Sequence, residues 1–264
     1  MNARFGFAVV SAALLATLLV SCGKKGESSE STPAPTAAPA ATSVDAATAG
    51  SVTGSVKLEG AAPKARKINM AADAYCNSQH PGGVSDEEGV ADAKGDLANV
   101  IVYVKDGLGG RTFDVSKTPV EISQKGCMYS PHVVALMAGQ PLSVVNGDKT
   151  THNIHPVPKN NREWNKSQQV GAPNIEETFA REEVSIPVKC NIHPWMKSYI
   201  GVFKNPYFQV TGANGSFELK NLPPGTYTIE AWHEKYGTSD QTVTIGPKES
   251  KAVTFTFKAA AAGD

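Results

Sequence analysis

The chain has 264 residues, enough for one large domain or two small ones. Lys and Arg together number 25, and so do Asp and Glu, so the formal net charge is zero. This balance gives no electrostatic reason to expect nucleic acid or a strongly charged partner. With 24 Gly, 17 Pro and short apolar runs rich in Val, Ile, Thr and Phe, the composition favours an all-β fold with many turns.

The N-terminus has the pattern of a targeting segment. Arg4 precedes an apolar run over residues 5–20, about the length of a signal-peptide core. The run ends in the letters LVSC, which resemble a bacterial lipobox. The resemblance implies that residues 1–21 are a lipoprotein signal peptide and that Cys22 carries the lipid. The alternative is an uncleaved single-span anchor, for which the run is short.

Both interpretations place the folded part outside the cytoplasm, in the periplasm or at the cell surface and anchored to the membrane. Gly23 follows the cysteine, and no aspartate stands there to suggest inner-membrane retention, so the outer membrane is weakly preferred. Residues 22–49 are Ser, Thr, Ala and Pro with few large apolar groups. They cannot bury enough apolar surface to offset the entropy of ordering, so we expect a disordered linker.

Strand-like runs and turns alternate from residue 50 onward. Residues 51–58 alternate between apolar and polar side chains and predict a half-buried strand, and residues 97–105 predict another. Between them, residues 61–96 are polar and irregular, so we expect a long loop that carries Cys76 and His80.

The middle of the chain continues in the same way, and no long amphipathic helix is expected anywhere. Further strands are predicted at 119–123, 142–145, 183–188 and 199–203, and five more at 207–211, 216–220, 226–232, 241–245 and 251–258. Residues 156–182 are rich in Pro, Asn, Gln and charge and predict a loop or a sheet edge. Where the strand 226–232 ends, we expect Trp232 in the core and His233 exposed.

One loop between two predicted strands concentrates the residues that bind soft metals. Cys190, His193 and Met196 lie within seven residues, and Cys sulfur and His nitrogen suit copper or zinc. Two nitrogens and a thiolate with a weak axial Met describe an electron-transfer copper site, whereas zinc sites rarely recruit Met. The site needs a second His, and His152, just after the tight turn Asn146-Gly147-Asp148, is the best candidate.

These two loops resemble those of the small blue-copper proteins, the cupredoxins, and amicyanin in particular. The segment CNIHPWM has the spacing Cys-x-x-His-x-x-Met, and the segment HNIH supplies the His-Asn pair on a separate loop. The resemblance covers roughly residues 118–204. It implies a Greek-key β-sandwich with one type 1 copper. The ligands it implies are His152, Cys190, His193 and Met196.

The resemblance also assigns supporting roles. Asn153 would hydrogen-bond the two ligand loops together, Pro194 would stiffen the second loop, and Trp195 would lie beside the outer edge of His193, where the electron leaves. Two other interpretations of the site stay open: a buried structural thiol with histidines nearby by chance, and a zinc site. We expect the remaining histidines, His80, His132, His155 and His233, not to be ligands.

The lipobox resemblance assigns Cys22 to lipid, and the cupredoxin resemblance assigns Cys190 to metal. Cys76 and Cys127 are left, and in an extracytoplasmic compartment a disulfide between them is the default. It would pin the long 61–96 loop to the strand that enters the copper domain.

The C-terminal part resembles a second family. The segment GSFELKNLPPGTY is similar to the carboxypeptidase-regulatory or transthyretin-like β-sandwich, whose first strand resembles residues 50–56. Similar segments occur in accessory domains of rhamnogalacturonan lyases, but no catalytic residue comes with the resemblance, so we infer no lyase activity. We expect nesting: residues 50–108 with 206–258 form this sandwich around a cupredoxin domain at 109–205. The alternative is two consecutive domains.

Taken together, the sequence predicts a membrane-tethered periplasmic type 1 copper protein that transfers single electrons between redox partners, such as a cytochrome or an oxidase. It is expected to be an electron carrier and not an enzyme, and to bind no nucleic acid. One alternative is a copper delivery or storage protein without a redox role. The other is a carbohydrate-binding or adhesive β-sandwich, which rests on Trp164 and Tyr236 in loops.

Overall fold

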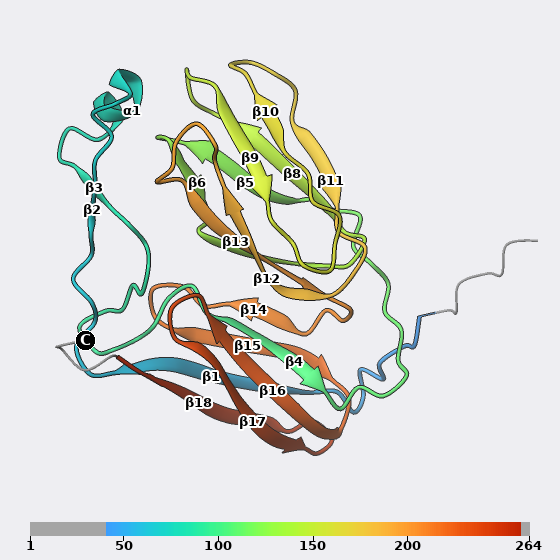
Figure 1. Cartoon of the computed structure of the whole chain (residues 1–264). Coiled ribbons are helices and arrows are strands. Elements are labelled where there is room, and N and C mark those ends of the chain that lie inside the picture. Colours follow the sequence, from blue (N-terminus) through green and yellow to red (C-terminus); the bar gives the residue numbers. More distant parts are fainter. Residues whose placement is uncertain (1–40, 260–264) are drawn as a thin grey trace, which may run out of the picture. The chain divides into compact units, whose positions relative to one another are not determined.

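The structure, a computed structural model, describes residues 41–259, and its strands confirm the all-β prediction (Figure 1). Cys22, the predicted signal peptide and most of the predicted linker lie outside the described residues. No helix in the described part of the chain is long and apolar enough to cross a membrane.

Two sheets enclose the first hydrophobic core. One sheet has the strand order β15-β1-β18 and the other the order β14-β4-β16-β17. The strands are β1 (Gly50–Glu59), β4 (Ile101–Asp106), β14 (Phe208–Val210), β15 (Ser216–Leu222), β16 (Gly225–His233), β17 (Gly237–Ile245) and β18 (Ser250–Lys258). Val52, Val56 and Leu58 point from β1 into this core, as strand periodicity requires.

Strands from the two ends of the described chain share these sheets. β1 runs parallel to β18 and antiparallel to β15, and β4 pairs with β14 and β16. Gly54 fits at the crowded centre of β1 because a Cβ atom there would lie 1.9 Å from the carbonyl oxygen of Val253. The assignment of nested domain boundaries stays a prediction.

Two further sheets enclose the second core. Their strand orders are β10-β9-β12-β13-β7 and β11-β8-β5-β6. The strands are β5 (Val120–Lys125), β6 (Met128–Ser130), β7 (Val133–Met137), β8 (Pro141–Asn146), β9 (His152–Pro156), β10 (Lys166–Gln168), β11 (Ile175–Thr178), β12 (Glu183–Lys189) and β13 (Lys197–Phe203). Ile122, Val144, Ile154, Ile186 and Ile200 are fully buried between these sheets.

Strand register brings the two predicted ligand loops to one end of this second pair of sheets. β9 and β12 are antiparallel, with Lys189 opposite His155, so the start of β9 lies beside the end of β12. The turn before β9 and the loop after β12 therefore leave the sheet at the same end. The segment 156–182, predicted to be loop or edge, contributes the edge strands β10 and β11.

The 61–96 loop is more ordered than the sequence predicts. It contains the paired strands β2 (Lys67–Ile68) and β3 (Val84–Ser85) with helix α1 (Ala74–Gln79) between them, a segment named here the 67–85 hairpin. The side chain of Asp73 caps α1 by accepting from the backbone N–H of Cys76. The disulfide Cys76–Cys127 joins α1 to the turn before β6, as predicted.

The expectation for the end of β16 is wrong. His233 is fully buried and Trp232 is half-buried, the reverse of the prediction for the histidine. Side chains alternate along a strand, and His233 shares the inward face of β16 with Ile229 and Ala231. Trp232 points to the other face, where it packs against Tyr199 with ring centroids 5.4 Å apart.

A smaller buried cluster joins the two pairs of sheets. Ile101 and Tyr103 of β4 pack with Val133 of β7 and Phe203 of β13. The rings of Tyr103 and Phe203 have their centroids 4.7 Å apart. β13, the strand that follows the second ligand loop, is thus packed on both of its faces.

Candidate metal centre

The structure brings His152, Cys190 and His193 together. One ligand atom from each lies within 4.8 Å of the others. The two Nδ1 atoms are 3.0 Å apart, and the Cys190 sulfur lies 3.8 Å from Nδ1 of His193. Exposed fractions of 0%, 3% and 2% leave these side chains almost no contact with solvent. A thiol sulfur and two imidazole nitrogens therefore converge on one buried point.

Backbone hydrogen bonds close the second ligand loop on itself. The N–H of Met196 donates to the carbonyl of His193 at 2.9 Å, and the N–H of Cys190 donates to the carbonyl of Met196 at 3.3 Å. The N–H of His193 donates to the Cys190 sulfur at 3.3 Å. The Met196 side chain is fully buried in the same core cluster as Cys190. The loop conformation thus fixes three of the four predicted ligand residues.

Asp148 orients His152, and sequence reasoning missed it. Its Oδ2 lies 2.8 Å from Nε2 of His152, and the carboxylate also accepts from the backbone N–H groups of Gly126 and Cys127, each at 2.7 Å. A proton on Nε2 satisfies this contact and leaves Nδ1 free to bind a metal. The available signal was its position, four residues before His152 in a tight turn.

Asn153 connects the two ligand loops. Its Oδ1 accepts from the backbone N–H of Asn191 at 3.0 Å. Its amide nitrogen donates to Asn165 and to the carbonyl of Lys166. This contact couples the position of His152 to that of Cys190, because Asn153 and Asn191 are their neighbours in sequence.

The outer edge of His193 is covered by the 67–85 hairpin. Its Nε2 lies 3.3 Å from a carboxylate oxygen of Asp73 and 3.6 Å from the sulfur of Cys76. The Trp195 ring lies alongside, with its centroid 5.1 Å from that of His193, and its Nε1 donates to the carbonyl of Cys127 at 3.0 Å. The sequence placed Trp195 here and predicted the disulfide, but it gave no indication that Asp73 and Cys76 contact His193.

The electrostatics favour a thiolate at this point. Burial raises the pKa of the Cys190 thiol, but hydrogen bonds from His152 and from backbone N–H groups outweigh it, and the pKa falls below its usual range. Burial lowers the pKa of His152, but its contacts with Asp148 and Cys190 outweigh that effect and raise it. A deprotonated sulfur is the form that binds metal.

The residues present fit a copper ion. Cys190, His152 and His193 would hold it, with Met196 as the weak fourth ligand. Cys190 is the free cysteine among the described residues, so its sulfur is available to a metal. Copper would supply reversible one-electron chemistry.

The other histidines that were expected not to be ligands have partners elsewhere or lie in a core. His80 lies 2.6 Å from the carbonyl of Gly126, His132 lies 2.5 Å from Glu234, and His155 lies 2.6 Å from Glu163. His233 is buried among aromatic rings. None of these four belongs to the groups of candidate metal-binding side chains in residues 41–259.

Comparison with known families defines the class of the C-terminal part. The family model for the carboxypeptidase regulatory-like domain matches residues 206–258, as the sequence resemblance predicted. The matched segment comprises β14 to β18 of the first pair of sheets. Among curated proteins, no match was found.

Solved structures similar to this chain include several copper proteins. The Cu-containing nitrite reductase NirK from Thermus scotoductus SA-01 is 19% identical over 37% of this chain and 25% of its own, with a TM-score of 0.32. A purple cupredoxin from Nitrosopumilus maritimus is 21% identical over 31% of this chain and 98% of its own, with a TM-score of 0.27. An oxidised amicyanin mutant is 13% identical over 38% of this chain and 97% of its own, with a TM-score of 0.29. The candidate metal centre is defined by the positions of this chain's own side chains.

Proposed function

We propose that this chain is a type 1 copper protein that carries single electrons outside the cytoplasm. The observation that supports the proposal is the convergence of the Cys190 sulfur with Nδ1 of His152 and Nδ1 of His193 at one buried point. A thiolate donates strongly to Cu(II), imidazoles bind both oxidation states, and a long thioether contact favours Cu(I). Such a donor set changes little between the two oxidation states.

The surrounding residues support this role because their contacts hold the candidate ligand side chains in place. Asp148 fixes the ring of His152, Asn153 connects the ligand loops, and the turn around His193 closes on the Cys190 sulfur. Preorganised ligands reduce the structural change that accompanies a change of charge at the site.

Optical spectroscopy of copper-loaded protein tests the proposal. We expect an intense thiolate-to-copper absorption band in the red part of the visible spectrum, lost in Cys190→Ser and kept, with a shifted position, in Met196→Gln. His132→Gln is the matched control, because that imidazole pairs with Glu234 and belongs to no candidate metal-binding group among the described residues, so the band should stay unchanged. A colourless Cu(II) form whose Cys190 thiol still reacts with alkylating reagents would exclude the proposal.

The location and partner are part of the same proposal. We infer a lipid anchor at Cys22 in the outer membrane and a redox protein partner such as a cytochrome or an oxidase, with the chain acting as a carrier and not as an enzyme. Replacement of residues 1–22 by a signal peptide that is cleaved without lipidation should release the protein from the membrane fraction into the soluble periplasmic fraction. Continued membrane attachment of that variant would show that the anchor lies elsewhere.

A further inference from the structure

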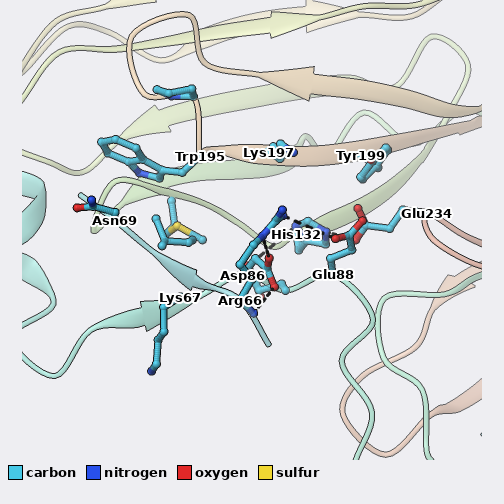
Figure 2. Close-up of a pocket in the computed structure, with 14 residues that line it drawn as sticks. Arg66, Lys67, Asn69, Asp86, Glu88, His132, Trp195, Lys197, Tyr199 and Glu234 are labelled. Carbon is cyan, nitrogen blue, oxygen red and sulfur yellow. Dashed lines mark hydrogen bonds and ion pairs between the residues drawn. The ribbon is translucent and has the colours of Figure 1, made fainter. Parts of the chain in front are cut away.

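Trp195, the residue beside His193, also lines a cavity of about 390 Å³ (Figure 2). This volume falls in the range of small-molecule sites, roughly 300–1,000 Å³. As Figure 2 shows, Trp195, Lys197 and Tyr199 line one side, and Arg66 and Asp86 lie on the segment that faces them. The cavity therefore lies between the 67–85 hairpin with its flanking residues and the strand that leaves the ligand loop.

The charged groups around the cavity nearly balance one another, with three permanent cations and His132 against four carboxylates. Arg66 pairs with Asp86 at 2.9 Å, and His132 pairs with Glu234 at 2.5 Å. Two Lys and two Glu complete the charged lining. Contacts with Glu234, Glu87 and a backbone carbonyl outweigh the burial of His132 and raise its pKa, so it contributes a positive charge in acid. A balanced lining of this kind suits a neutral ligand better than an ion.

Four uncharged groups of the lining are aromatic or apolar and half-buried, and they lie beside the exposed Asn69 and Pro194. Trp195 and Tyr199 provide ring surfaces, and Ile68 and Met128 provide apolar surface. Flat aromatic molecules bind to such surfaces by stacking and by burial of apolar area. Because the carboxylates of the cavity accept hydrogen bonds, a ligand that also carries hydroxyl donors would use both kinds of group. These are the properties of a phenol.

Trp195 connects this cavity to the candidate metal centre. Its ring centroid is 5.1 Å from that of His193, and the bond from its Nε1 to the carbonyl of Cys127 fixes its orientation. A ligand on the cavity side of Trp195 is separated from a metal ligand by one aromatic ring. A sugar would also stack on Trp195 and bond to carboxylates. A sugar is not an electron donor, however, so a position beside a candidate metal ligand gives it no function.

We infer that the cavity binds a small neutral phenol of the hydroquinone class against Trp195, as a source of electrons for the metal centre. The inference rests on the proposed function. A bound hydroquinone would give one electron to the metal centre of the protein that holds it and one proton to water, and would leave as the semiquinone. A second protein molecule would accept the second electron and the second proton would pass to water, which completes the oxidation to the quinone.

Binding is tested first in the metal-free protein, with resorcinol, an isomer of hydroquinone that cannot form a quinone. The indole N–H resonances of the three Trp residues report on the site in a nuclear magnetic resonance titration. We expect a saturable shift of one indole signal, which disappears in Trp195→Leu. Trp164→Leu is the matched control, because Trp164 packs against Phe179 and does not line the cavity.

Two results of this titration would overturn the inference: no shift with resorcinol, or a saturable shift with glucose or cellobiose in its place. Met128→Trp gives a second variant, in which the larger side chain should fill the cavity and weaken resorcinol binding at least 10-fold. Unchanged binding in a folded Met128→Trp protein would also overturn it.

Reduction of the copper-loaded protein is tested second, by anaerobic mixing with hydroquinone. We expect a rate that saturates with hydroquinone concentration and falls when resorcinol is added, whereas reduction by ferrocyanide is not slowed by resorcinol. A rate linear in hydroquinone and insensitive to resorcinol contradicts the inference alone. If the copper-loaded protein lacks the absorption band, the proposed function is contradicted. Resorcinol binding to the metal-free protein tests the cavity independently of that result.

Discussion

The outer nitrogen of His193 lies 3.6 Å from the sulfur of Cys76, which is half of a disulfide. A residue proposed as a metal ligand is thus in contact with a covalent crosslink that holds α1 over the site. Asp73 adds a carboxylate at 3.3 Å from the same nitrogen. The 67–85 hairpin, which covers the candidate metal centre, is therefore connected directly to one of the candidate ligands.

Removal of this crosslink should loosen the cover and destabilise the fold. In Cys76→Ser with Cys127→Ser, we expect a loss of about 2–4 kcal/mol in the free energy of unfolding, because the bond closes a loop across a separation of 51 residues. We also expect a chelator to remove copper faster than from the parent protein. Urea unfolding and the decay of the visible band measure the two effects, and Ser78→Ala on the exposed side of α1 is the control. Equal chelation rates in both proteins would refute the covering role.

Asp148 should control metal affinity through His152. Asp148→Asn keeps the shape of the side chain but removes the charge that holds a proton on Nε2 of His152, so we expect copper affinity to fall about 10–100-fold. Competition with a chelator of known affinity measures the change. Asp92→Asn is the matched control, because Asp92 also accepts two backbone N–H groups but contacts no His. A loss of affinity in both variants would point to a general effect of turn carboxylates.

His233 should make the protein less stable in acid. Burial lowers its pKa to about 4, against 6.5 in the unfolded chain, although the neighbouring Glu234 opposes the shift while His132 and Lys235 add to it. The unfolded state therefore binds the extra proton between these two pH values, and the free energy of unfolding falls as the pH is lowered through that window. The shift corresponds to about 3 kcal/mol. Urea titrations of the parent protein and of His233→Gln should show a flatter acid dependence in the variant.

His132 should act in the opposite direction. Its pKa is raised because contacts with Glu234 and Glu87 outweigh its burial, so its ion pairs stabilise the fold below pH 6.5 and lose this effect as the pH rises through the folded value. We expect His132→Gln to lose stability mainly at low pH, as measured by the same urea titrations. A uniform loss across the pH range would show that packing, and not charge, accounts for the role of His132.

Gly54 should tolerate no larger residue. A Cβ atom at this position would lie 1.9 Å from the carbonyl oxygen of Val253 and 2.7 Å from the ring of Phe217, so the parallel pair of β1 and β18 would have to separate. We expect Gly54→Ala to cost at least about 2 kcal/mol in the free energy of unfolding. Gly82→Ala is the control, because a Cβ there would meet nothing within 4 Å. Equal thermal midpoints for the two variants would contradict the close approach.

The meeting of the candidate ligand side chains could be predicted because the pattern of their residue types is local. Cys190, His193 and Met196 stand on one short loop, and the spacing of soft donors there already indicates a metal. His152 follows a strong turn signal between two strands, which places it at a sheet end. The strands with regular alternation, such as residues 50–59, were likewise predictable because one face of each is buried.

The surroundings of the site could not be predicted, because they depend on contacts between distant segments. Asp73 meets His193 across 120 residues, and nothing in the polar 61–96 segment distinguishes that carboxylate from its neighbours. His233 was assigned to the surface on its polarity, but the register of β16 places it on the buried face. The prediction from residue type was wrong for His233, because its position along the strand decides its burial.

The central claim is that Cys190 and two imidazoles bind one copper ion, and a paramagnetic resonance spectrum of the Cu(II)-loaded protein tests it most directly. The account predicts a narrow copper hyperfine splitting, because the thiolate draws unpaired spin away from the metal, and its disappearance in Cys190→Ser. A wide splitting, typical of copper bound to nitrogen and oxygen alone, and unchanged in Cys190→Ser, would contradict it.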